Sequence, residues 1–324
     1  MATIPLLMRS RGLLCILLLF LGWSHGAGGA ENKPAPTPSP SPDPQEELFA
    51  AGKELFDQYA PAEVKEQFDF PTPQQWDQFA GRLQQALESQ DLDKLATFEP
   101  EARAALTALK DLPDYTDYAE WLEARLDYIE AARQTCGLPT ARVPTRPPAT
   151  QPGKAIPPNL PYYDLWLRRI QSRPVPSAAA KYLPVLRAAF QAEGVPAELV
   201  WLAEAESTFS PGARSPSGAK GLFQLMPETA KGLGLSTWLP DERTDPARSA
   251  RAAAHYLHGL HERFGDWPLA IAAYNAGEGR IRRLLDAQRA KTFAEIAPHL
   301  PAETRMYVPK VFALMWVRAG GIPG

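Results

Sequence analysis

The chain is 324 residues long; 45% of its residues are hydrophobic, 22% are charged, and its formal net charge is −3. This length and apolar content are sufficient for one or two packed domains with additional tails. The sequence contains no dense run of basic residues, so we expect no nucleic-acid partner.

The first 30 residues have the pattern of an export signal. Two arginines precede an apolar run from Leu13 to Trp23, and small residues follow it. The run is shorter than the roughly 20 residues that a membrane-spanning helix needs. We therefore expect cleavage near Ala27 or Ala30 and no stable membrane span afterwards; retention of the signal would leave the protein associated with the membrane.

Two proline-rich segments, 31–45 and 138–159, predict extended linkers around a helical segment. Between the linkers, the stretches 46–60, 72–90 and 115–134 show helical periodicity. Residues 46–137 carry 20 acidic and 8 basic side chains, a net charge of −12. Residues 161–324 carry 15 acidic and 20 basic side chains, a net charge of +5. We predict a small acidic helical domain over 46–137 and a second domain over 160–324. The opposite charges allow docking of the two halves, attraction of the basic half to an anionic polymer, or simply two solvated surfaces.

Helix start and stop signals divide the second domain. The pattern predicts one helix between Ser177 and Gly194, one between Asp245 and Gly265, and a third that begins at Asp266. No comparable stretch shows the alternation of a β-strand. The domain is therefore predicted to be all-α, with room for a short hairpin in the loop 207–222.

Glu206 lies on the apolar side of a predicted helix that begins near Pro196. Leu199, Leu202, Ala203 and Glu206 share one helical face. Burial against apolar walls disfavours a charged carboxylate and raises its pKa, which suits a general acid. The alternative is that Glu206 only caps or ties down the loop that follows it.

Four motifs follow one another in the second half of the chain: Glu206 with Ser207, "GAKGLFQLMP" (218–227), "AYNAG" (273–277) and "ETRMYVPKV" (303–311). In this order they resemble the soluble-lytic-transglycosylase-type domain of the lysozyme-like superfamily, and especially the membrane-bound murein transglycosylase D branch. The resemblance covers roughly residues 160–318. It implies an all-α, lysozyme-like catalytic domain.

The resemblance also implies an activity. Members of the family cleave the β-1,4 bond between N-acetylmuramic acid and N-acetylglucosamine in peptidoglycan without water, leaving 1,6-anhydro ends. Glu206 matches the single catalytic residue, which acts first as acid and then as base. Peptidoglycan glycan strands would be the substrate and the periplasm the location. Two alternatives remain: a hydrolytic muramidase that uses a second carboxylate, and an inactive peptidoglycan-binding scaffold.

Six further positions match substrate-binding residues of the family. Ser215 matches a serine that hydrogen-bonds the catalytic carboxyl, although "RSPSG" is also an ordinary turn sequence. For Met226 and Tyr274, packing in the core is the alternative. Glu303 is expected to hold Tyr307 in place. The six positions are Ser215, Gln224, Met226, Tyr274, Asn275 and Tyr307.

Three histidines at 255, 258 and 261 occur at intervals of three, but they fan around a predicted helix instead of converging. We expect them to be solvated or to pack on neighbours. We expect no metal and no organic cofactor. Residues 46–137 are the candidate region for a protein partner.

Overall fold

The computed structural model of the protein describes residues 73–110, 116–136 and 159–320. The predicted export signal, the linker 31–45, the helical pattern at 46–60 and nearly all of the linker 138–159 lie outside these ranges. All described residues belong to one compact unit, Asp43–Gly324. None of the helices in the described ranges has the length and apolar character that a membrane span requires.

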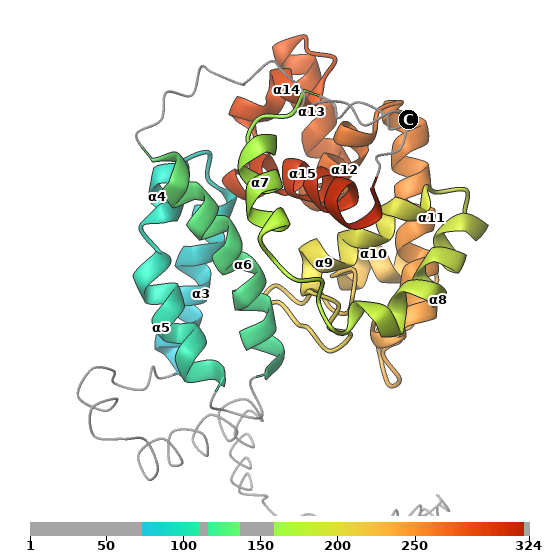
Figure 1. Ribbon diagram of the computed structural model, residues 1–324, viewed down its shortest axis with the longest axis horizontal. Helices are drawn as coiled ribbons and strands as arrows, with labels where there is room; N and C mark the ends of the chain where they lie inside the picture. Colours follow the sequence, from blue (N-terminus) through green and yellow to red (C-terminus); the bar gives the residue numbers. More distant parts are fainter. Residues whose placement is uncertain (1–72, 111–115, 137–158, 321–324) are drawn as a thin grey trace, which may run out of the picture. The chain divides into compact units, whose positions relative to one another are not determined.

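The first described segment consists of four helices (Figure 1). Helices α3 and α6 lie where the periodicity predicts them. The two shorter helices between them were not predicted; the first begins where Asp91 accepts a hydrogen bond from the Lys94 amide at 2.9 Å. The four are α3 (Pro73–Glu88), α4 (Leu92–Ala96), α5 (Glu99–Lys110) and α6 (Thr116–Thr135).

The second described segment, residues 159–320, is also helical, so the predicted all-α class is confirmed. Instead of a hairpin, the loop after Glu206 has two isolated antiparallel bridges, which pair Lys220 with Arg214 and with Leu225. Its α-helices are α7 (Tyr163–Gln171), α8 (Ala179–Ala192), α9 (Leu202–Ser207), α10 (Pro227–Gly232), α11 (Pro246–Phe264), α12 (Trp267–Ala276), α13 (Glu278–Gln288), α14 (Phe293–Ile296) and α15 (Ala302–Leu314).

The predicted helix ends in this segment are confirmed by their caps. Asp245 accepts a hydrogen bond from the Arg248 amide at the start of α11, and Gly265 ends this helix in the left-handed conformation. Asp266 accepts from the Leu269 amide at the start of α12. These caps satisfy amides and carbonyls that have no partner within the helix.

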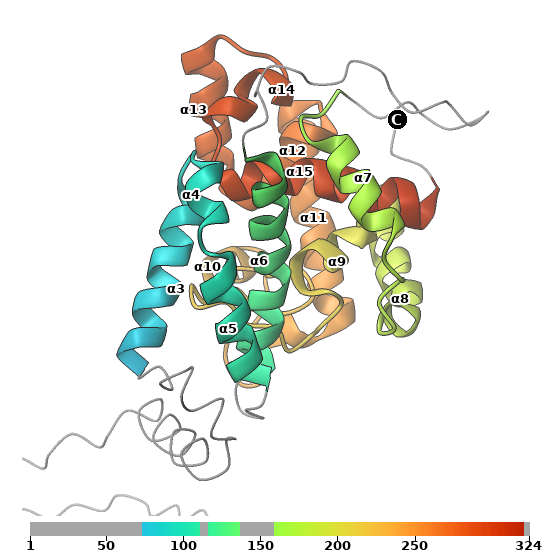
Figure 2. The same cartoon turned by 60° about the vertical axis from the view of Figure 1, so that its left-hand side comes forward.

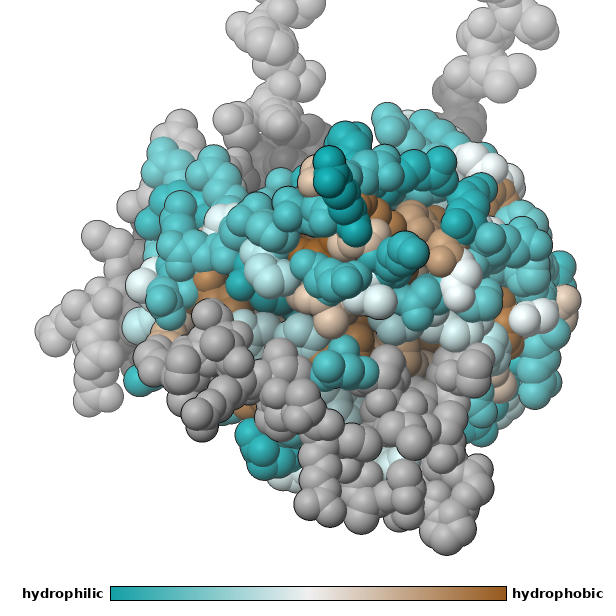
Figure 3. Space-filling model, turned by 90° about the horizontal axis from the view of Figure 1, so that it is seen from above, coloured by the Kyte–Doolittle hydropathy of each residue, from teal (hydrophilic) through white to brown (hydrophobic). Residues whose placement is uncertain are grey.

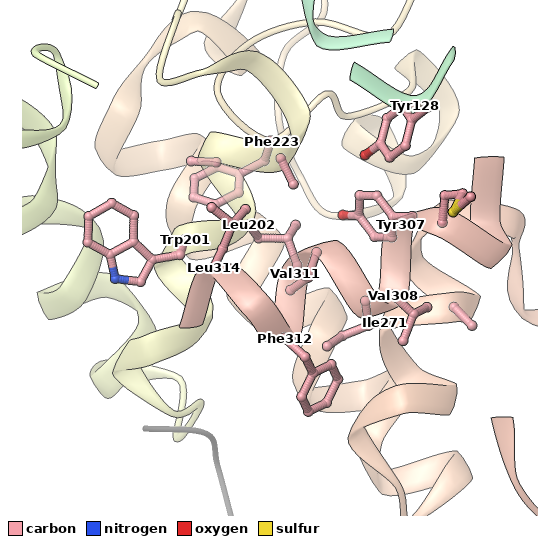
Figure 4. Packing of buried hydrophobic residues seen from close by; sticks show 14 of the residues in the cluster. Tyr128, Trp201, Leu202, Phe223, Ile271, Tyr307, Val308, Val311, Phe312 and Leu314 are labelled. Atoms are coloured by element: carbon pink, nitrogen blue, oxygen red, sulfur yellow. The ribbon is translucent and has the colours of Figure 1, made fainter. Parts of the chain in front are cut away.

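Helix α15 runs through the centre of the core. It packs against α7, α9 and α12, and also against α3 and α6 of the first segment (Figures 1 and 2). Figure 4 shows Val308, Val311 and Phe312 of α15 among the buried apolar side chains, with Leu202 of α9 nearby. Apolar burial of this kind contributes roughly 25 cal/mol per Å². The core therefore holds α9, which carries Glu206, against α15.

Helices α3–α6 belong to the same hydrophobic cluster as the second segment. Helix α6 contacts α9 directly, and the views in Figures 1 and 2 agree on this placement. The division into domains at 137–160 stays a prediction. The face of the molecule in Figure 3 is mostly hydrophilic, and apolar residues show only between polar side chains on its described part.

Gly221 is required by the loop that follows Glu206. Its φ is +86°, and a Cβ at this position would lie 1.9 Å from the Arg243 carbonyl oxygen. We expect Gly221→Ala to lower the free energy of unfolding by at least about 2 kcal/mol, because it combines a left-handed backbone with a steric clash. Urea denaturation measures the change.

Gly232→Ala is the matched control for this prediction. Gly232 lies in α10 and has open space where a Cβ would be. Alanine there should leave stability unchanged or raise it by about 0.5–1 kcal/mol. Equal effects of the two substitutions would contradict the close approach of Gly221 to Arg243.

Candidate active site

The backbone reverses direction immediately after Glu206. A 3₁₀ turn (Ala197–Trp201) leads into α9, and the helix ends at Ser207. Thr208 and Phe209 then adopt the left-handed conformation, with φ of 52° and 62°. Ser207 Oγ lies 3.0 Å from the Leu222 carbonyl oxygen, to which it can donate. The turn thus places Glu206 at the end of a helix, next to the loop 213–225.

Glu206 is buried, with 5% of its surface exposed. The hydroxyl of Tyr307 on α15 donates a hydrogen bond to Glu206 Oε1 at 2.5 Å. Burial raises the pKa of Glu206 to about 7, although the positive charge of Arg125 and the Tyr307 hydrogen bond both lower it. A large fraction of Glu206 therefore carries a proton at neutral pH.

Tyr274 and Asn275 lie at the end of α12 and tie this end to two other elements. The Tyr274 hydroxyl donates to the Phe223 carbonyl oxygen at 2.8 Å. Asn275 Oδ1 accepts a hydrogen bond of 2.7 Å from the Thr304 hydroxyl on α15. Burial, followed by the charge of Glu206, raises the pKa of Tyr274, so the two groups are neighbours.

The "GLFQLMP" segment divides into buried and exposed side chains. Phe223 is fully buried and its ring packs against Phe190 at 5.6 Å between centroids. Gln224 Nε2 donates to the carbonyl oxygens of Ala213 and Gly221, which closes the loop on itself. Its Oε1 has no hydrogen-bond partner among the described residues. Met226 is 42% exposed and precedes α10.

Ser215 holds the same loop. Its Oγ accepts a hydrogen bond of 2.9 Å from the Ala219 amide, which closes the turn that contains Gly218. Ser215 therefore has the role of a turn residue, the alternative that its sequence context allowed. The hydrogen bond between Ser215 and the Glu206 carboxyl stays a prediction.

The structure thus joins Glu206 directly to Tyr307 and brings Tyr274 close. Sequence reasoning missed Arg125, a buried side chain of α6 that donates to the Glu206 carbonyl oxygen at 3.3 Å. It lies 81 residues before Glu206, and no local pattern connects the two. Glu303 pairs with this arginine, Nη2 to Oε1, at 3.3 Å.

Other buried charges near the site hold helices together. Glu204 forms an ion pair with Arg318. Lys310 of α15 contacts Asp127 of α6 at 2.9 Å and lies over the ring of Tyr128. Buried charges require such partners because their desolvation is costly.

The histidines of α11 are separately engaged. His255 contacts Glu193, and His258 contacts Glu262 in the next turn of α11. His261 stacks on Trp267 at 4.0 Å, and its burial lowers its pKa. Within the described ranges no group of three or more potential ligands could hold a metal ion.

The chain is similar to known proteins of one family. Residues 184–297 match the family model described as Transglycosylase SLT domain. Membrane-bound lytic murein transglycosylase D of Escherichia coli (strain K12) is 38% identical over 140 residues, 42% of this chain and 31% of that protein. The "Putative tributyltin chloride resistance protein" of Alteromonas sp. (strain M-1) is 35% identical over 146 residues, 44% of this chain and 67% of that protein. The chain belongs to the lytic transglycosylase family.

The aligned part of this chain spans about a third of the Escherichia coli relative. The solved structure of lytic transglycosylase Slt from Pseudomonas aeruginosa aligns with 83% of this chain and 45% of that chain, at 21% identity and a TM-score of 0.39. The matched region 184–297 includes Glu206, Tyr274 and Asn275. Tyr307 and Arg125, which contact Glu206, lie outside it.

Proposed function

We propose that this protein cleaves the β-1,4 bond between N-acetylmuramic acid and N-acetylglucosamine in peptidoglycan and leaves 1,6-anhydro-muramic ends. Its family membership and the environment of Glu206 support this activity. The observation that carries the proposal is a buried carboxyl with a pKa of about 7, hydrogen-bonded by a tyrosine that remains a donor because its own pKa is raised. We place the activity in the periplasm, in agreement with the export signal expected in residues 1–30.

Glu206 would perform two proton transfers in sequence. In its protonated form it donates a proton to the glycosidic oxygen while the bond from this oxygen to C1 of the muramoyl residue breaks. The resulting carboxylate then accepts the proton of the muramoyl C6 hydroxyl while the C6 oxygen bonds to C1. The second transfer restores the acid, so the same side chain is ready for another cycle.

Tyr307 determines which oxygen of Glu206 can react. Because its hydroxyl donates to Oε1 at 2.5 Å, the transferred proton would reside on Oε2. The hydrogen bond also stabilises the carboxylate that forms after the first transfer. Tyr307 would therefore orient Glu206 rather than touch the sugar.

The remaining predicted positions are proposed to contact the glycan strand. Met226 is exposed and offers an apolar surface to a sugar ring. Gln224 Oε1 is buried and has no partner among the described residues, so it would accept from a sugar hydroxyl or amide only after the loop shifts. Asn275 and Tyr274 are half-buried beside this segment. Ser215 would act through the turn that it closes.

A hydrolytic mechanism needs a second carboxylate to activate water or to form a covalent intermediate. Glu303 is near enough for its charge to raise the pKa of Glu206. It is ion-paired with Arg125 and mostly buried, which opposes a role as the base for a water molecule. This arrangement favours the anhydro-forming reaction over hydrolysis.

The test is mass spectrometry of the soluble products that the purified full-length protein releases from peptidoglycan. Muramic ends lighter by one water than reducing ends are expected. Glu206→Gln should release at least about 10²-fold less product in the same time, and Glu262→Gln, on the exposed side of α11, should behave as the wild type. Reducing ends would instead establish a muramidase, and no release by the wild type would favour a binding scaffold.

A further inference from the structure

Arg125 belongs to the acidic N-terminal segment, outside the region that matches the family model and outside the predicted catalytic domain 160–324. It is nevertheless one of the few buried arginines of the described chain. Its guanidinium lies 5.5 Å from the centre of the Trp121 ring, which holds the side chain against α6. The side chain is thus directed from α6 toward the candidate active site.

The guanidinium joins two elements of that site. Arg125 Nη1 donates to the Glu206 carbonyl oxygen on α9, and Nη2 pairs with Glu303 Oε1 on α15, both at 3.3 Å. Glu303 lies four residues before Tyr307, so both side chains are on the same face of α15. Tyr307 in turn donates to the Glu206 carboxyl. Glu206 is therefore held at its backbone by Arg125 and at its carboxyl by Tyr307.

Helix α6 also holds the loop that follows Glu206. The Ser210 hydroxyl donates to Glu120, and the Arg214 amide donates to the Asp117 carbonyl oxygen at 3.4 Å. Farther along α6, Asp127 pairs with Lys310 of α15. These contacts place α6 against the chain on both sides of Glu206.

Several titratable groups face Glu206 from the elements packed around it. Helix α6 contributes Arg125 and Tyr128, and α12 contributes Tyr274. Helix α15 contributes three groups, Glu303, Tyr307 and Lys310. Among these charges, that of Arg125 has the largest lowering effect on the pKa of Glu206, whereas that of Glu303 raises it. Removal of Arg125 and removal of Glu303 should therefore have opposite effects.

We propose that Arg125 is a positioning residue for Glu206, and that α6 is consequently part of the catalytic unit instead of a separate module. This inference rests on the proposed function only where it is tested by the rate of glycan cleavage. Arg125 holds the backbone of the catalytic residue and pairs with the carboxylate that shares a helix face with Tyr307. It also supplies the positive charge that keeps Glu206 available as a base in the second proton transfer.

The test compares pH profiles of four full-length variants. General-acid action by Glu206 predicts that kcat/KM on soluble glycan strands falls as pH rises through its pKa of about 7. Arg125→Met should move this alkaline limb up by about one pH unit, and Glu303→Gln should move it down. Arg125→Lys keeps the charge and should leave the limb near its wild-type position. Arg133→Met, on the exposed side of α6, should change nothing.

A merely structural role for Arg125 predicts a different result. Loss of packing would lower the rate at every pH in both Arg125 variants without moving the limb. An unmoved limb in Arg125→Met, or shifts of the same sign in Arg125→Met and Glu303→Gln, would overturn the inference. If circular dichroism shows that Arg125→Met fails to fold, Glu303→Gln serves as the test. A downward move of its alkaline limb would support the inference, and an upward move would overturn it.

A second readout separates this inference from the proposed function. The Glu206 carboxyl can be titrated by ¹³C NMR in protein labelled at glutamate, and its resonance is assigned by its loss in Glu206→Gln. Opposite shifts of this pKa in Arg125→Met and Glu303→Gln would support the inference even if no product were released. An unchanged Glu206 pKa in both variants would overturn it in a fully active enzyme as well.

Discussion

Glu206→Gln is expected to reduce the rate of glycan cleavage by about 10²–10⁴-fold, the range that a positioned general acid and base contributes. The amide has nearly the same shape as the acid, so the Tyr307 hydroxyl retains an acceptor at Oε1. The glutamine amide, however, can neither donate a proton to the leaving oxygen nor accept one from the C6 hydroxyl. Initial rates of product release measure the loss, with Glu262→Gln as the exposed control. A fall of less than tenfold would remove Glu206 from the chemistry.

The same substitution has a predicted effect on stability that depends on pH. The pKa of Glu206 is raised from 4.5 to about 7 in the folded protein. A raised pKa means that stability is complete below the pKa of the unfolded chain and is lost as pH rises through the folded value. Wild-type protein should therefore lose up to about 3 kcal/mol relative to Glu206→Gln between pH 4 and pH 9.

Urea denaturation at several pH values tests this difference. The unfolding free energies of wild type and Glu206→Gln should diverge above about pH 5, with the variant becoming the more stable protein at alkaline pH. The Glu262→Gln control should follow the wild type across the whole range. Parallel curves for Glu206→Gln and wild type would mean that the carboxyl ionises without the cost of burial.

Asp127→Asn is expected to lower the free energy of unfolding by about 3–5 kcal/mol, the cost of leaving a buried charge without its partner. Asp127 Oδ2 contacts Lys310 at 2.9 Å, and Oδ1 accepts from Arg169 at 2.7 Å and from Arg173 at 2.6 Å. Lys310 is buried, and the Arg169 side chain is only 9% exposed. Asparagine at position 127 would remove the carboxylate that these three cations share. They lie on α7, in the loop that follows it and on α15.

Two controls accompany this prediction. Glu101→Gln removes an exposed ion pair with Arg82 and should cost no more than about 1 kcal/mol. The double variant Asp127→Asn with Lys310→Met should recover part of the loss, because the unpaired cation is removed. The three cations hold the pKa of Asp127 well below its usual range, so the wild-type advantage should shrink as pH falls below about 4. An equal loss in Glu101→Gln and Asp127→Asn would contradict the role of burial.

Local patterns were sufficient for much of the helical architecture. Each helix cap contacts backbone groups within one turn of its own position. The positions of Asp245, Gly265 and Asp266 therefore predict where α11 begins and ends and where α12 begins. The longer α3 and α6 followed from periodicity. Helices α4 and α5 did not; α4 has only 5 residues, and both helices are stabilised by packing against α6.

Some features of the candidate site were likewise predictable from local sequence patterns, and others were not. The position of Glu206 on an apolar helical face was visible in the sequence, and its burial and raised pKa agree with that prediction. The sequence also predicted a connection between Glu303 and Tyr307 from their spacing. It did not predict that Glu303 pairs with Arg125, because a contact across the fold leaves no periodic trace.

By itself, the sequence determined the helical class, the ends of the capped helices and the apolar helical face on which Glu206 lies. These features depend on side chains within a few positions of one another. Only the tertiary structure decided which groups surround that acid. Arg125 and Tyr307 lie 81 and 101 residues from Glu206, and both reach it because α6 and α15 pack against α9. The pKa of Glu206 depends on burial, on the charge of Arg125 and on the hydrogen bond from Tyr307, so it is a property of the packed helices.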